Sequence, residues 1–163
     1  MDPIELPYFG HFTGDDIRKQ DVLVGGNNIG MDLNLNQQGL TERGASYLNI
    51  FLKNLEEHAV KNRQFIDEYY DEADEENALK FYLDFHKEEA LEEMQDALNV
   101  DPTADDLNLQ LIAKLKLARV GLYPNNANFF AIFDYTFGKD FTNYVLVLIT
   151  DAAGNIQEIT VES

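Results

Sequence analysis

Four glutamates have the spacing best suited to chemistry. Glu88 and Glu92, and likewise Glu89 and Glu93, are four residues apart, so on a helix each pair lies one turn apart on the same face. Carboxylates in this arrangement bind a divalent cation if a second helix adds ligands, and His86 is close enough in sequence to join them. A di-iron bundle would require two Glu-x-x-His pairs, which the three histidines do not supply. We therefore expect a solvated acidic helix face, with no metal and no cofactor.

Other catalytic and ligand-binding patterns are equally weak. The chain has no cysteine and no G-x-S-x-G motif, which argues against thiol chemistry and a serine nucleophile. The segment "DPTADD" fails as a calcium loop, because Asp106 stands where glycine is required and Ile112 where the bidentate glutamate belongs. Nothing singles out a catalytic pair among the 30 acids. We identify no catalytic residue and favour a protein that is not an enzyme, without excluding a hydrolase.

Charge is the most informative bulk property. The 163 residues carry a net charge of −18, and residues 67–106 alone hold 16 acids against Lys80 and Lys87. Direct binding to nucleic acid is disfavoured, because it needs clustered Lys and Arg. A basic protein would instead be attracted, although the same charge could serve solubility alone. We predict that partner-binding residues lie in this segment, namely Asp74, Glu75, Glu76, Glu88, Glu89, Glu92, Glu93 and Asp96.

The pattern of apolar residues predicts strands, then helices, then strands. Strands are expected over about residues 5–36, helices over about 41–117 and strands again over about 118–162. This order indicates one α+β domain over residues 1–163, in which N-terminal and C-terminal strands form an antiparallel sheet and about four helices pack on one face. The first helix is capped by Thr41. The third begins near Asp74 and carries a buried stripe that includes Leu79, His86 and Met94.

Two turns and one strand are predicted in more detail. "GGNNIG", residues 25–30, precedes alternating apolar residues and therefore reads as a hairpin rather than a phosphate-binding loop. Asp151 and Gly154 suit a type I turn with a glycine bulge. A further short strand is expected near Tyr8 and Phe9.

The segment "NFFAIFDYTF", residues 128–137, contains five aromatic rings. On a strand, one face would carry Phe129, Ala131, Phe133, Tyr135 and Phe137. We expect this face to lie in the core under the helices, in preference to an exposed aromatic docking surface.

The location of the protein is predicted from what its sequence lacks. The first residues, "MDPIELPYFGHF", do not have the form of a signal peptide. The longest apolar run, "YVLVLI" at residues 144–149, is far short of the ~20 residues of a membrane-spanning helix. We expect a cytoplasmic protein without a membrane partner.

The stretches "PYFGHFTGDD", "DVLVGGNNIGMDLNLN" and "LTERGASYLNIFLKNLEE" resemble a family of small bacterial α+β proteins, a domain of unknown function. Acidic proteins of this build occur beside polymorphic toxins as their immunity proteins. The resemblance covers roughly residues 7–75 and a sheet-forming C-terminus. It implies a bacterial, cytoplasmic, non-enzymatic protein, and it brings no catalytic residues.

Two functions of different class follow. In the first, the acidic helical face covers a basic partner, for instance the active site of a nuclease toxin. In the second, a pocket between the sheet and the helices binds a small molecule or hydrolyses it.

Overall fold

The computed structural model describes residues 3–13 and 18–163 and confirms the α+β class. Four strands precede the helices: β1 (Ile4–Leu6), β2 (Gly10–Phe12), β3 (Arg18–Val24) and β4 (Asn27–Leu33). The helices are α1 (Glu42–Lys53), α2 (Leu55–Tyr69), α3 (Ala78–Leu98) and α4 (Leu107–Lys114). Four strands follow: β5 (Lys116–Leu122), β6 (Ala131–Thr136), β7 (Val145–Thr150) and β8 (Ile156–Glu162).

The main sheet joins both ends of the chain but is mixed rather than wholly antiparallel. Its six strands run in the order β3-β4-β5-β6-β7-β8. All neighbours are antiparallel except β4 and β5, which are parallel with Gly30 opposite Arg119. The reason is the connection between them: all four helices lie between β4 and β5, and a long helical crossover returns the chain in the same direction.

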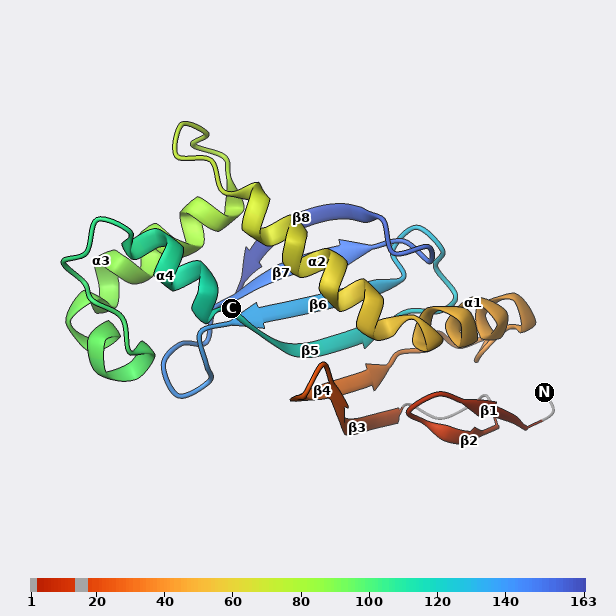
Figure 1. Ribbon diagram of the computed structural model, residues 1–163. Helices are drawn as coiled ribbons and strands as arrows, with labels where there is room; N and C mark the ends of the chain where they lie inside the picture. Colours follow the sequence, from red (N-terminus) through yellow and green to blue (C-terminus); the bar gives the residue numbers. More distant parts are fainter. Residues whose placement is uncertain (1–2, 14–17) are drawn as a thin grey trace.

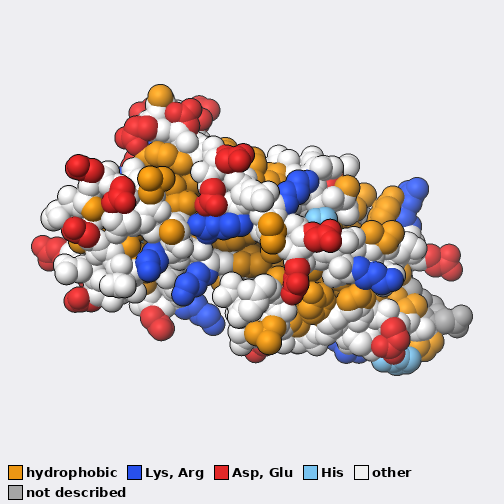
Figure 2. Space-filling model, in the orientation of Figure 1, with side chains coloured by type: hydrophobic (Ala, Val, Ile, Leu, Met, Phe, Trp, Pro, Cys, Tyr) orange, Lys and Arg blue, Asp and Glu red, His pale blue; other side chains and the backbone are white. Residues whose placement is uncertain are grey.

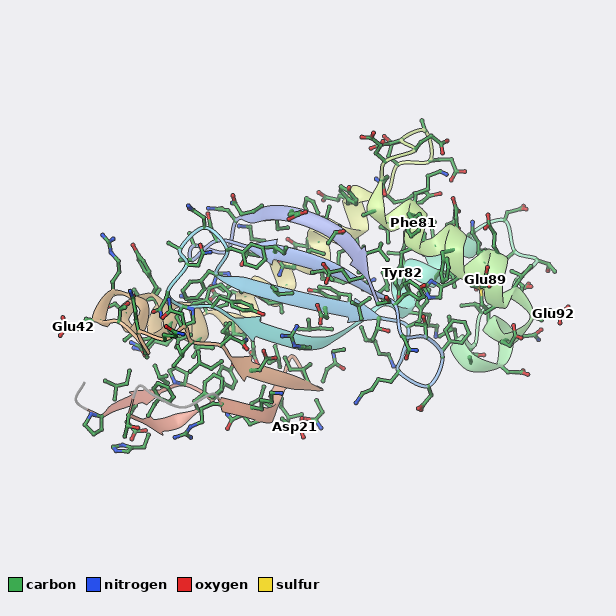
Figure 3. All side chains as sticks on the ribbon, turned by 180° about the vertical axis from the view of Figure 1, so that it is seen from behind. Asp21, Glu42, Phe81, Tyr82, Glu89 and Glu92 are labelled. Atoms are coloured by element: carbon green, nitrogen blue, oxygen red, sulfur yellow. The ribbon has the colours of Figure 1, made fainter. Side chains whose placement is uncertain are left out.

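The helices leave one face of the sheet open. In Figure 1, α2 runs across the sheet, α1 continues it toward one end, and α3 and α4 lie at the opposite end. Seen from behind in Figure 3, no helix lies over the sheet. Among residues 3–13 and 18–163, none of the helices combines the length and the apolar character needed to cross a membrane.

Both predicted turns are confirmed. Gly25 and Gly26 connect β3 to β4 with φ of 57° and 82°, the left-handed values that a two-residue hairpin turn requires. The Gly154 N–H donates to the Asp151 carbonyl at 3.0 Å, and Gly154 has φ of 87°. The strand predicted near Tyr8 and Phe9 is wrong in position, because these residues lie in the turn between β1 and β2, a separate two-stranded sheet.

The aromatic segment packs as predicted from Ala131 onward. Ala131, Phe133, Tyr135 and Phe137 are all buried. The prediction is wrong at the start of the segment, where Phe129 is only half-buried while Phe130 is buried and packs on Phe51, with ring centroids 5.1 Å apart. The alternation fails there because the Asn126 side chain accepts hydrogen bonds from the N–H groups of residues 128 and 129, which bends the chain before β6 begins.

The helix starts depend on side-chain caps. Thr41 caps α1 as predicted, by accepting a hydrogen bond from the Gly44 N–H at 2.9 Å. The predicted start of α3 near Asp74 is wrong, because α3 begins at Ala78 and is capped by Asn77. Asp71 and Asp74 each accept a hydrogen bond from the N–H two residues ahead, and such local bonds favour turns over a helix.

Candidate functional site

The acidic surface is one of two candidate sites. We define it as the eight predicted acids, which the structure places on the α2–α3 loop and along α3. All eight are exposed. Figure 2 shows acidic side chains gathered at the end of the molecule that holds the α2–α3 loop, α3 and α4.

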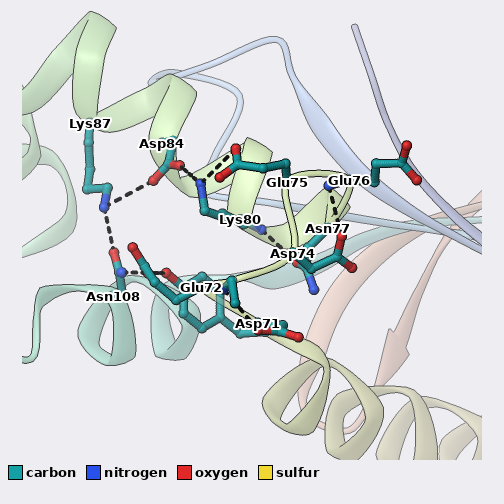
Figure 4. Close-up of polar contacts among 12 residues, drawn as sticks. Asp71, Glu72, Asp74, Glu75, Glu76, Asn77, Lys80, Asp84, Lys87 and Asn108 are labelled. Carbon is teal, nitrogen blue, oxygen red and sulfur yellow. Dashed lines mark hydrogen bonds and ion pairs between the residues drawn. The ribbon is translucent and has the colours of Figure 1, made fainter.

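The two lysines of this segment do not neutralise most of the acidic surface. Lys80 Nζ lies 2.9 Å from Asp84 and 3.8 Å from Glu75, and Lys87 Nζ lies 3.2 Å from the same Asp84. Lys87 also donates to the Asn108 side chain on α4 at 2.8 Å (Figure 4). Partial burial by itself would raise the pKa of Asp84, but hydrogen bonds from both lysines lower it below its ordinary value. Both cations are therefore used to join α3 to its neighbours.

The outer acids have no such partners. Glu75 forms an ion pair with Lys80, and the Asp74 side chain accepts a hydrogen bond from the backbone of its own turn. In the part of the chain that the structure describes, the other six members of the acidic surface form no ion pair. These six are Glu76, Glu88, Glu89, Glu92, Glu93 and Asp96. Their charges therefore face solvent.

Apolar side chains interrupt the acidic surface. Phe81 is 55% exposed and Leu91 is 41% exposed, and Phe81 stacks on Phe85 with ring centroids 6.3 Å apart. Figure 3 shows Phe81, Glu89 and Glu92 following one another along α3. Phe81 was not predicted from the sequence as part of this surface. Its offset of two residues from both Leu79 and Leu83 nevertheless places it away from the buried stripe.

A break in α3 separates two parts of the acidic surface. Ala90 has φ of −144° and ψ of 32°, which is not helical. The pairs Glu88–Glu92 and Glu89–Glu93 each span this break, so the one-turn spacing expected for a continuous helix does not apply to them. Within the described residues, no group of three or more His, Asp or Glu side chains is arranged to hold a metal ion.

His86 lies apart from these glutamates, in the core. It is 2% exposed, one ring nitrogen lies 2.7 Å from the Tyr82 carbonyl and the other 2.8 Å from the Thr142 hydroxyl. The Tyr82 ring packs on the imidazole with centroids 4.3 Å apart. Burial lowers the pKa of His86, so the imidazole is neutral at pH 7 and ties α3 to the β6–β7 loop.

We expect His86 to make the protein less stable in mild acid. Below the ordinary histidine pKa of about 6.5, the unfolded chain binds a proton that the folded His86 resists, so the free energy of unfolding should fall as pH drops below 6.5. In His86→Gln, this part of the pH dependence should disappear when urea denaturation is measured between pH 5 and pH 7.5. Burial also lowers the pKa of His58, so His58→Gln serves as the comparison. This substitution should remove only the part of the pH dependence that comes from His58. An unchanged pH profile in His86→Gln would contradict the assignment.

The second candidate is a depression on the open face of the sheet, with a volume of about 810 Å³. Its lining comes from β3 to β7 and from the β6–β7 loop. Charged side chains of both signs line it, namely Lys19, Asp21, Asp32, Arg119, Asp134 and Lys139.

Arg119 organises the centre of this depression. Its Nε and Nη2 donate to the two carboxylate oxygens of Asp32 at 2.7 and 2.8 Å, and its Nη1 donates to Asp134 at 3.2 Å. The guanidinium lies over Gly121, where an added Cβ would come within 2.7 Å of Nη2. Gly121 is therefore the residue that lets Arg119 lie flat between the two carboxylates.

The two carboxylates are not equally well satisfied. Asp32 accepts both bonds from Arg119 and a third from the Asn34 side chain at 2.6 Å. From the described residues, Asp134 accepts only the longer bond from Arg119. Burial raises the pKa of Asp134 even though Arg119 opposes the shift. Such a carboxylate beside a depression marks a candidate binding group.

This depression was not predicted from the sequence. Arg119 is 87 residues from Asp32 and 15 residues from Asp134 in the sequence. Only the register, with Gly30, Arg119 and Asp134 opposite one another on β4, β5 and β6, brings them together. The depression also lies on the open face of the sheet, not between sheet and helices as the pocket hypothesis expected.

Comparison of the chain with protein-family models, with characterised proteins and with solved structures finds no match.

Proposed function

We propose that the protein binds a basic protein through the acidic surface, as an immunity protein would cover a cationic toxin. The supporting observation is that all eight acids are exposed while both nearby lysines are engaged with Asp84. A positively charged partner would find a dense, uncompensated negative field at one end of the molecule.

The exposed apolar residues of the same surface contribute to partner binding in a second way. Charge complementarity mainly speeds association and selects partners. Lasting binding needs buried apolar anchors, and aromatic residues are frequent among them. Phe81 is exposed at the edge of the acidic α2–α3 loop, so it is the anchor that we expect a partner to cover.

The test begins with a pull-down from the native host, followed by association kinetics at two salt concentrations. Replacing Glu88, Glu89, Glu92 and Glu93 together by Gln should slow association about tenfold or more at low salt. The difference should shrink at high salt, where the screening length is only ~3 Å at 1 M. Folding should be intact, because all four side chains are exposed.

A matched variant controls for net charge. It replaces four exposed glutamates away from α3 by Gln, namely Glu42, Glu56, Glu57 and Glu158. The control should slow association much less, since its charges lie outside the contact. Phe81→Ser should leave the association rate nearly unchanged and speed dissociation. An acidic partner, or equal effects of the two fourfold variants, would refute the proposal.

A further inference from the structure

The depression on the open face has unused hydrogen-bonding groups of both charges. Three of the five guanidinium N–H groups of Arg119 donate to Asp32 and Asp134. The other two have no partner among the described residues, and the side chain is 37% exposed. Asp134 uses only its Oδ2, so its Oδ1 has no donor among the described residues. Because Arg119 Nη1 and Asp134 Oδ2 are 3.2 Å apart, these unused donors and the unused acceptor lie close together.

A ligand that carries both charges pairs with both groups, which neither a simple anion nor a simple cation does. A simple anion on Arg119 would meet the Asp134 carboxylate, and also Asp21, which lines the same depression. A simple cation on Asp134 would meet Arg119, and also Lys139, which lines the same depression. The geometry points to a free α-amino acid as the ligand, with its carboxylate on Arg119 and its ammonium group on Asp134. In such a molecule the two charged groups are attached to one carbon, which matches the close spacing of the protein groups.

Space for the rest of the ligand lies over Gly30. This residue has no side chain and is opposite both Asp21 and Arg119 in the sheet. A Cβ added at Gly30 would meet only the Ala118 carbonyl, at 3.9 Å. A volume of about 810 Å³ is in the range of small-molecule sites. An amino acid with no net charge would also enter without opposition from the overall charge of −18.

In the experiment, the protein of residues 1–163 is titrated with the common α-amino acids one at a time. Binding is measured by calorimetry and by NMR of the backbone amides. At least one should bind saturably and shift amides of β4, β5 and β6. Its N-acetyl derivative lacks the ammonium charge and its amide derivative lacks the carboxylate, so each should bind about tenfold or more weakly. Acetate and methylamine are tested as the separate charged groups, and neither should bind measurably.

Substitutions in the depression test whether the amino acid binds there. Asp134→Asn removes the negative charge that would pair with the ammonium group. Gly30→Val fills the space while leaving the ion pairs of Arg119 in place. Each should weaken binding about tenfold or more, whereas Asp140→Asn, an exposed neutralisation in the β6–β7 loop, should have little effect. If Asp134→Asn does not fold, Gly30→Val and the two derivatives still decide the question.

Three outcomes overturn the inference. The first is the absence of saturable binding by any amino acid at millimolar concentration. The second is equal binding of acetate, which would make the depression a plain anion site. The third is binding that Gly30→Val leaves intact, which would place the ligand elsewhere. None of these results bears on the acidic surface, which is at a different place on the molecule.

Discussion

Phe133→Ala should destabilise the protein by about 3–5 kcal/mol, the range for removing a buried phenylalanine side chain. Phe133 is 0% exposed. It lies in the middle of β6 between Val120 on β5 and Leu148 on β7, which are both fully buried. Its ring also packs on Phe51 of α1, with centroids 6.2 Å apart. The substitution would therefore open a cavity where sheet and helices meet, which rigid neighbours can refill only in part.

Phe129→Ala is the matched control, because it removes the same atoms from a half-buried ring just before β6. It should cost clearly less than Phe133→Ala, since less area returns to water and no closed cavity remains. The measurement is urea denaturation of both variants, supported by the thermal midpoint. For a chain of this size, Phe133→Ala should lower the midpoint by roughly 6–20 °C. Equal losses from the two variants would show that the core is not centred on Phe133.

The contrast between these two phenylalanines shows what alternation can predict. From Ala131 to Tyr135 buried and half-buried residues alternate, because these residues lie in a paired strand, and the buried face was predicted correctly. At Phe129 it fails, since Asn126 bends the backbone there through its side chain. A local hydrogen bond of this kind competes with the strand, and hydrophobic periodicity carries no sign of it.

Long-range pairing limits prediction more severely. The acidic surface could be predicted from sequence because its residues are neighbours along one segment and charged side chains stay exposed. The ion pairs of Arg119 could not, because Asp32 and Asp134 come from strands on either side of β5. Even the correct set of strands would leave this site undefined, since a register shift of one residue would turn these side chains to the other face.

Gly121→Ala should destabilise the protein by about 1–3 kcal/mol, although it adds only a methyl group and removes no charge. The new Cβ would lie 2.7 Å from Arg119 Nη2 and 3.1 Å from its Cζ. The guanidinium would have to rise from the sheet and give up good hydrogen bonds to Asp32. Asp134, whose pKa burial already raises, would then lose the cation that opposes this shift. The difference from the wild type should therefore narrow as pH falls toward the ordinary Asp pKa of about 3.9, because a protonated Asp134 no longer needs Arg119.

Gly30→Ala, on the neighbouring strand β4, should not destabilise the protein as Gly121→Ala does. Gly30 faces the same depression, and its Cβ would meet nothing closer than 3.9 Å. Neither glycine has a positive φ, so alanine strains the backbone at neither position. Gly30→Ala should be neutral or stabilising by up to about 1 kcal/mol, since alanine reduces the entropy of the unfolded chain. Denaturation of both variants at pH 7 and pH 4.5 measures these effects. If the two substitutions change the free energy of unfolding by the same amount in the same direction, Arg119 does not depend on the space above Gly121. Its ion pairs with Asp32 and Asp134 would then not fix the position of the guanidinium.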